Sequence, residues 1–234
     1  MSAPATTTGF EFAKAGNTNH FYLLHSLLKT RAEHPAIPVA VCWPHSTVAL
    51  AGAVEAAEAG LIEPILVGDA AEIAAIAKDL DLNIKPYRLI EVATEEEAAA
   101  KAVELCKTNR AGALMKGSLH TDLLMKYVVA KETGLRTSRR ISHVFVMEAP
   151  RYNRTLLITD AAINIAPTLE DKVSITQNAI DLAHELGIET PRVAILSAVE
   201  TINCKMISTL DAAALCKMSD RGQITGAILD GPLA

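Results

Sequence analysis

The chain has 234 residues, half of them apolar and only 4 % aromatic, with a net charge of −5. This length suits one large domain or two modest ones with a substantial core. The negative charge argues against a nucleic-acid partner or a basic membrane surface, and no apolar run approaches the ~20 residues of a membrane span.

Residues 1–16, rich in Ala, Thr and Gly, are predicted to form a flexible leader without the basic and apolar regions of a secretory signal. The four cysteines show no CxxC spacing. We therefore expect a cytoplasmic protein in which Cys42, Cys106, Cys204 and Cys216 are buried, reduced thiols that bind no metal.

Short apolar runs alternate with helical patterns between residues 17 and 140, which we interpret as a first α/β domain. After a helix at 20–29, the pattern predicts strands at 39–43, 64–67, 87–92 and 113–115. Helices follow the first three strands, with Ser46 as one N-cap and Thr94 and Glu97 as a capping box. Such alternation is typical of a mostly parallel, doubly wound sheet.

A second α/β domain is predicted over residues 141–234. Runs at 141–148 and 155–159 indicate a hairpin. A helix at 169–186, a strand at 192–196, a helix at 208–220 and a strand at 224–230 follow, with Ser208 and Asp211 as a capping box. Because only Gly231-Pro232-Leu233-Ala234 follows the last strand, we expect this domain to be incomplete at its carboxyl end.

Three polar clusters lie at predicted strand ends. Lys116-Gly117-Ser118-Leu119-His120-Thr121 combines a glycine, a helix start and a cation, as anion sites do, although a capped helix with a solvated lysine also fits. Ser142 and His143 lie near Arg136, Arg139 and Arg140, whose guanidinium groups suit phosphates, although a buried histidine and solvated arginines are the ordinary alternative.

The third cluster is Thr159, Asp160 and Asn164, directly after an apolar strand. Ligands of α/β sheets bind at the carboxyl ends of strands, but Asp and Asn also satisfy the backbone of turns. Nucleotide loops of the GxGxxG or GxxxxGK[ST] type, a GxSxG elbow and metal motifs are absent from the sequence.

Several segments together resemble the phosphate acetyl/butyryltransferase family. They are LMKGSLHT at 114–121, GLRTSRRISHVFV at 134–146, LITDAAINIAP at 157–167, PRVAILSAVE at 191–200, STLDAAAL at 208–215 and the terminal DGPLA. The similarity is collinear from about Val39 to Ala234. Each motif alone is weak, but the combination is specific.

The resemblance implies two α/β domains of the isocitrate/isopropylmalate dehydrogenase-like type, in a homodimer. It also implies transfer of an acetyl, butyryl or similar acyl group between coenzyme A and phosphate, with the coenzyme A thioester as substrate and no permanently bound cofactor. Matched positions expected to bind substrate are Lys116, Thr121, Ser142, His143, Thr159, Asp160 and Asn164, with Arg136 or Arg140 on the coenzyme A phosphates. The family's Ser-Arg pair and catalytic Asp are expected beyond Ala234, so we expect these 234 residues to have impaired turnover.

Three other functions stay open at this stage. A phosphate acyltransferase of phospholipid synthesis would need a deeper apolar tunnel. A dehydrogenase of the same fold would need Asp clusters for a metal and a nucleotide loop. A non-catalytic relative would bind acyl-CoA or a partner without turnover.

Overall fold

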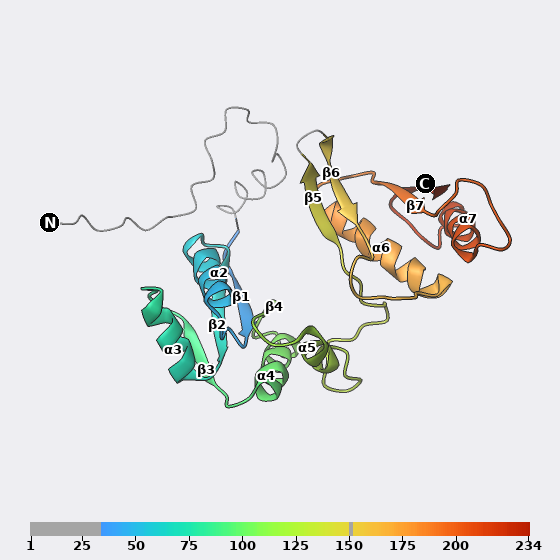
Figure 1. Ribbon diagram of the computed structural model, residues 1–234. Helices are drawn as coiled ribbons and strands as arrows, with labels where there is room; N and C mark the ends of the chain where they lie inside the picture. Colours follow the sequence, from blue (N-terminus) through green and yellow to red (C-terminus); the bar gives the residue numbers. More distant parts are fainter. Residues whose placement is uncertain (1–33, 150–151) are drawn as a thin grey trace. The chain divides into compact units, whose positions relative to one another are not determined.

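The computed structural model describes residues 34–149 and 152–234, which form two compact units that divide between Arg139 and Arg140 (Figure 1). Each unit is described by itself. The helix predicted at 20–29 and the leader lie outside the described residues.

The first unit contains a four-stranded parallel sheet of order β3-β2-β1-β4. Its elements are β1 Ile37–Cys42, α2 Thr47–Glu58, β2 Ile62–Gly68, α3 Ala70–Asp79, β3 Arg88–Glu91, α4 Glu95–Lys107, β4 Ala113–Lys116 and α5 Thr121–Val128. The predicted alternation of strands and helices is confirmed, with strand boundaries that differ by at most two residues.

Helices cover both faces of this sheet because its strands are apolar on both sides (Figure 1). Ala40 and Cys42 of β1 pack with α4 and α5, whereas Val39 and Val41 pack with α2 and α3. This alternation follows from the strand geometry, in which successive side chains point to opposite faces. The predicted N-cap Ser46 is also confirmed, since its Oγ accepts a hydrogen bond from the Ala49 amide at 3.2 Å.

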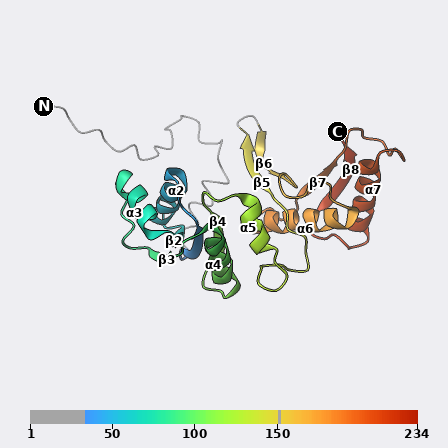
Figure 2. The same cartoon turned by 60° about the horizontal axis from the view of Figure 1, so that its bottom comes forward.

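The second unit contains two separate two-stranded sheets and two helices (Figure 2). β5 Phe145–Ala149 and β6 Tyr152–Ile158 form the predicted antiparallel hairpin. α6 Leu169–Glu185, β7 Arg192–Leu196, α7 Ile207–Asp220 and β8 Ile228–Leu233 follow, and β7 pairs with β8 in parallel. Ile180 of α6, Leu215 of α7 and Ile224 form its small core.

Four predictions for individual residues are wrong. The last strand begins at Ile228, not at Ile224, and runs to Leu233, because Ile224 packs in the core ahead of a glycine with φ of +87° at Gly226. Ser208 and Asp211 form no capping box. The N-cap of α7 is Met206, while the Ser208 hydroxyl bonds Ser197 and Asp211 forms an ion pair with Lys172.

The other two errors concern exposure and strand extent. Cys204 is exposed, since it lies in the loop before α7, and Cys106 and Cys216 are only half-buried. Cys42 is fully buried, as predicted, and burial raises its pKa to about 12. Residues 141–144 are not part of β5. The His143 backbone bonds side chains of the turn after β6 instead of a neighbouring strand.

Candidate functional site

The turn after β6 is organised around the carboxylate of Asp160. Its Oδ1 accepts hydrogen bonds from the backbone amides of His143 at 3.1 Å and of Ala162 and Ile163 at 3.3 Å. Its Oδ2 accepts from the Asn164 amide at 2.8 Å and from the Asn164 side chain. Five donors therefore converge on one carboxylate, which uses most of its accepting capacity.

These bonds stabilise the charged form of Asp160. Partial burial of the carboxyl group acts to raise its pKa, but the hydrogen bonds from the Asn164 side chain and the backbone amides outweigh burial. The pKa is lowered from 3.8 to about 2. Asp160 is thus an anion throughout the neutral range and is poorly suited to accept a proton there.

The same turn fixes His143. The Thr159 hydroxyl donates to the His143 carbonyl at 2.8 Å, and the imidazole packs edge-on against Phe145 with 4.4 Å between ring centroids. The Nδ1 atom of His143 is buried and has no hydrogen-bond partner among the described residues. The backbone of His143 is therefore tied down at both its N–H and C=O groups, while its ring retains hydrogen-bonding capacity.

Arg140 and α6 extend this network. The Nε of Arg140 donates to Asn164 Oδ1 at 2.8 Å, and its Nη1 lies 3.5 Å from Asp171 Oδ1 in the first turn of α6. Asn178 of α6 donates to the Arg140 carbonyl at 2.9 Å and to the Ser142 hydroxyl at 3.0 Å. Five of the predicted site residues, Ser142, His143, Thr159, Asp160 and Asn164, thus share one network with Arg140.

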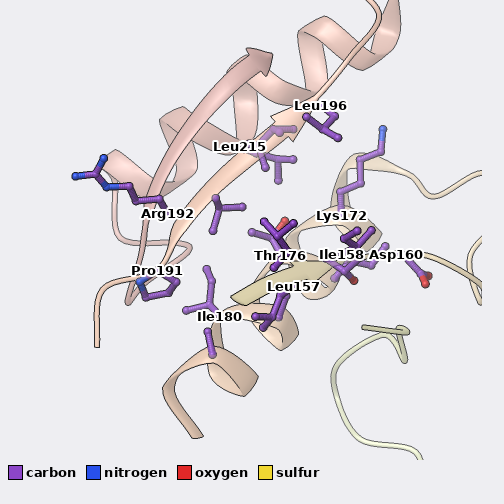
Figure 3. Close-up of a pocket in the computed structure, with 18 of the residues that line it drawn as sticks. Leu157, Ile158, Asp160, Lys172, Thr176, Ile180, Pro191, Arg192, Leu196 and Leu215 are labelled. Carbon is purple, nitrogen blue, oxygen red and sulfur yellow. The ribbon is translucent and has the colours of Figure 1, made fainter. Parts of the chain in front are cut away.

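A groove of about 1010 Å³ adjoins this network (Figure 3). Asp160, Asn164 and Lys172 are among the residues that line it, and Lys172 Nζ lies 2.6 Å from Asp211 Oδ2 of α7. The walls are formed by β6, α6 and β7. The turn therefore opens onto a mainly apolar hollow within the second unit.

Lys116 and Thr121 belong to the first unit. Lys116 ends β4, and its ammonium group donates to the carbonyls of Gly117 at 3.2 Å and Leu119 at 3.0 Å. Thr121 begins α5, whose N-cap His120 makes no side-chain capping bond. A lysine ammonium has three N–H donors, so Lys116 retains one for a ligand. Arg136 is exposed in the loop that follows α5.

Sequence reasoning missed a cluster beside Lys116. The Nε2 atom of His45 accepts from the Asp69 amide at 3.0 Å, and its Nδ1 lies 3.0 Å from Glu72 Oε2. The ring stacks on Trp43 with 3.6 Å between centroids, and the Trp43 carbonyl accepts from the amide and hydroxyl of Ser118. The only sequence signal was the run Trp43-Pro44-His45-Ser46 at the end of a buried strand.

Gly117 shows how closely the two loops approach. A Cβ atom at this position would lie 2.2 Å from the Trp43 carbonyl oxygen. Glycine is therefore required for packing between the loops after β1 and β4, independently of any ligand. Among the described residues, no three His, Cys, Asp or Glu side chains are grouped to hold a metal ion. Within the same residues, no helix is long and apolar enough to cross a membrane.

Comparison with known proteins decides the family. Residues 89–234 match the sequence profile of the family described as phosphate acetyl/butaryl transferase, which is more than half of the chain. The chain belongs to this family. The resemblance read from the motifs is thereby confirmed, and the family is one of phosphate acyltransferases.

Individual members are similar over most of the chain. A phosphate acetyltransferase of Rhizobium meliloti is 57 % identical over 204 residues, which are 87 % of this chain and 64 % of that protein. A phosphate butyryltransferase of Clostridium acetobutylicum is 46 % identical over 180 residues, 77 % of this chain and 60 % of that protein. The chain therefore spans less than two thirds of the length of these relatives.

A solved structure of the family supports the fold. A branched-chain phosphotransacylase from Enterococcus faecalis V583 has a TM-score of 0.70 and 29 % identity, with 85 % of this chain and 68 % of that chain covered. The mixed α/β architecture with a parallel sheet is therefore shared with a phosphotransacylase.

Proposed function

We propose that this family member takes part in the transfer of a short acyl group between coenzyme A and inorganic phosphate. The observation that carries the proposal is the network around Asp160, because it is built from the same segments that match the family. Two relatives with 57 % and 46 % identity are named for acetyl and butyryl transfer, which supports a short acyl group.

The reaction sets three demands on a site. A phosphate oxygen attacks the thioester carbonyl, a C–O bond forms, the C–S bond breaks, and the coenzyme A thiolate leaves. The phosphate needs an anion site, the tetrahedral intermediate needs hydrogen-bond donors for its oxyanion, and the leaving thiolate needs a proton. A free thiol has a pKa of about 8.5, so proton transfer near neutral pH needs little driving force.

We assign the phosphate to Lys116 and Thr121 of the first unit; Thr159, in the second unit, is assigned to the substrate together with Ser142 and His143. Lys116 supplies a positive charge and a spare donor, while Thr121 lies at the start of α5, where free backbone amides favour an anion. Arg136 or Arg140 is assigned to the coenzyme A phosphates, since each guanidinium group is exposed at least in part.

Ser142 and His143 are assigned to the acyl group. The unused Nδ1 of His143 can donate to a carbonyl oxygen when it carries the proton, and the Ser142 hydroxyl accepts from Asn178 and keeps its own proton to donate. Asp160 and Asn164 act on the substrate indirectly, because most of their hydrogen-bonding groups are used to hold this turn.

The test is acyl-phosphate-dependent formation of acyl-CoA, with acetyl phosphate and butyryl phosphate compared. It is run on the 234-residue chain alone and on the chain joined to the part of the R. meliloti relative that lies outside the match. His143→Gln in the active form is expected to lower kcat by about 10²-fold, the usual effect of losing an oxyanion donor. His184→Gln is the matched control, since His184 bonds Gly226 away from this turn. Absence of acyl-CoA formation in both forms would refute the proposal.

A further inference from the structure

Backbone hydrogen bonds join the carboxyl ends of three neighbouring strands in the first unit. β2, β1 and β4 lie side by side in the sheet, in that order. The Trp43 amide donates to the Val67 carbonyl of β2, and the Gly117 amide donates to the Cys42 carbonyl of β1, both at 2.8 Å. The loop that begins at Lys116 is therefore anchored on the residues at the end of β1.

The carbonyl oxygen of Trp43 makes most of this connection. It accepts hydrogen bonds from the His45 amide at 2.8 Å, from the Ser118 amide at 2.9 Å and from the Ser118 hydroxyl at 3.0 Å. The φ angle of Trp43 is +56°, a conformation that a bulky residue rarely adopts. Because such a conformation persists only where its surroundings hold it, the position of Ser118 depends on the groups that hold Trp43.

The buried ring of His45 is one of these groups. It stacks on the Trp43 ring with 3.6 Å between centroids, and only 4 % of the His45 side chain is exposed. Its Nε2 atom accepts from the Asp69 amide at 3.0 Å, directly after β2. A Cβ atom at Gly68 would lie 2.5 Å from Nε2, so the ring fills the space beside this glycine. His45 thus connects the loop after β2 to Trp43.

The Asp69 amide also fixes the proton of the His45 ring. A ring nitrogen that accepts a hydrogen bond carries no proton, so the neutral ring has its proton on Nδ1. Nδ1 lies 3.0 Å from Glu72 Oε2 but makes no well-aligned hydrogen bond among the described residues. The bond from the Asp69 amide to Nε2 is therefore the firmer of the two contacts.

We propose that His45 is a positioning residue for phosphate. Acting through Trp43 and Ser118, it holds the loop from Lys116 to Thr121 in the conformation that binds the anion. A loop that is ordered before binding loses less conformational freedom on binding, so this support raises the affinity. The inference rests on the proposed function, since the phosphate is assigned there to Lys116 and Thr121.

The test measures binding of inorganic phosphate to the 234-residue chain by NMR. The amide signals of residues 116–121 are followed as phosphate is added, with chloride at equal ionic strength as the reference, and hydrogen exchange follows the Ser118 amide. We expect phosphate to shift these signals and the Ser118 amide to exchange slowly. No turnover is required, so a failure of the acyl-transfer assay and a failure of this inference are separate results.

Two substitutions at His45 separate its contacts. Gln carries its carbonyl oxygen as far along the side chain as Nε2 of His and can accept from the Asp69 amide, whereas Asn is too short to do so. His45→Asn is expected to weaken phosphate binding about tenfold in Kd, as when one hydrogen bond no longer holds the loop, and to speed exchange of the Ser118 amide. His45→Gln is expected to stay within about twofold of the unsubstituted chain in both measurements.

Leu105→Ala is the control for a loss of stability alone. Leu105 is fully buried on α4, and its carbonyl accepts from the Ala111 amide ahead of β4, at the opposite edge of the sheet from His45. This substitution is expected to destabilise the same unit and to leave the Kd for phosphate unchanged. Far-UV circular dichroism checks that each variant is folded.

Several outcomes would overturn the inference. Phosphate that shifts none of the loop amides in the unsubstituted chain would show that the loop binds no phosphate for His45 to support. Equal weakening by His45→Gln and His45→Asn, or equal weakening by Leu105→Ala, would show that the bond to Asp69 has no special part. NMR of the imidazole nitrogens in the unsubstituted chain needs no variant, and a proton on Nε2 of the neutral His45 ring would contradict the inference directly.

Discussion

The two units are built from similar local patterns but are stabilised differently. In the first unit, Ala40, Val41 and Cys42 of β1 are fully buried beneath helices on both faces. In the second unit, the residues of β7 alternate between exposed and half-buried. The comparison shows that an apolar strand is buried only as far as its neighbours allow. Side-chain hydrogen bonds to the backbone hold the turn after β6, whereas helix packing buries the last four residues of β1.

The largest difference is expected for large-to-small substitutions. Leu66→Ala removes a fully buried side chain from β2 and is expected to lower the free energy of unfolding of the first unit by about 2–5 kcal/mol. Trp43, the one tryptophan of the chain, donates from its amide to Val67 of β2, so its fluorescence in urea reports this unit.

Leu196→Ala in β7 is the counterpart. Leu196 is 72 % exposed, and the loss is expected to stay within about 0.5 kcal/mol. Far-UV circular dichroism in urea measures it. A loss of 2 kcal/mol or more would show that the second unit packs Leu196 as tightly as the first packs Leu66. The proposed difference in packing between the two units would then be wrong.

Replacing the carboxylate of Asp160 tests how much the hydrogen bonds of the turn after β6 stabilise the second unit. Asp160→Asn leaves several of the five donors without a charged acceptor, and we expect a loss of about 2–3 kcal/mol confined to the second unit. Hydrogen exchange of the amides of Ala162, Ile163 and Asn164 measures it. The control is Asp220→Asn. Both side chains of the Asp220–Lys217 ion pair are exposed, so the pair should contribute less than about 0.5 kcal/mol. A shift in the Trp43 transition would contradict this confinement.

Acid is also expected to affect the stability of the two units differently. The pKa of Asp160 in the folded chain is about 2, below its ordinary value of 3.8, so the charged form stabilises the fold. This stabilisation is complete above about pH 4 and is lost as the pH falls toward 2. The same three amides are expected to lose protection across this window, and Asp160→Asn should remove that dependence. An unchanged pH profile in the variant would assign the acid sensitivity to another group.

Patterns that depend on neighbours in sequence were predicted well. The strand over Arg192–Leu196 was predicted with its observed bounds, because an apolar run follows Pro191 and precedes a polar loop. The N-caps Ser46 and Thr94 were also predicted, since a cap bonds an amide only three residues away.

Patterns that depend on residues distant in sequence were not predicted. Ser208 and Asp211 have the spacing of a capping box, but Ser197 and Lys172 bind them instead. The position of Asp160 at a strand end was predicted, whereas its bond from the amide of residue 143 depends on the hairpin that brings β5 beside β6. The hairpin itself was predicted, but no local rule gives the bond between His143 and Asp160, which lie 17 positions apart in the sequence.

The smallest difference between the two units is expected for the N-caps of α4 and α6. Thr94 Oγ1 accepts from the Glu97 amide at the start of α4, and Thr168 Oγ1 accepts from the Asp171 amide at the start of α6, both at 3.2 Å. Because a cap satisfies an amide of its own helix, Thr94→Ala and Thr168→Ala are each expected to cost about 1 kcal/mol.

Thr→Ser at either position is the control, since it keeps the hydroxyl and should restore most of the loss. Urea titration by Trp43 fluorescence measures the first substitution, and hydrogen exchange in the first turn of α6 measures the second. Asp171 also lies near Arg140, so its environment differs from that of Glu97. A loss well above 1 kcal/mol for Thr168→Ala alone would show that this cap supports the Arg140–Asn164 network, and that in the second unit even a local bond depends on tertiary structure.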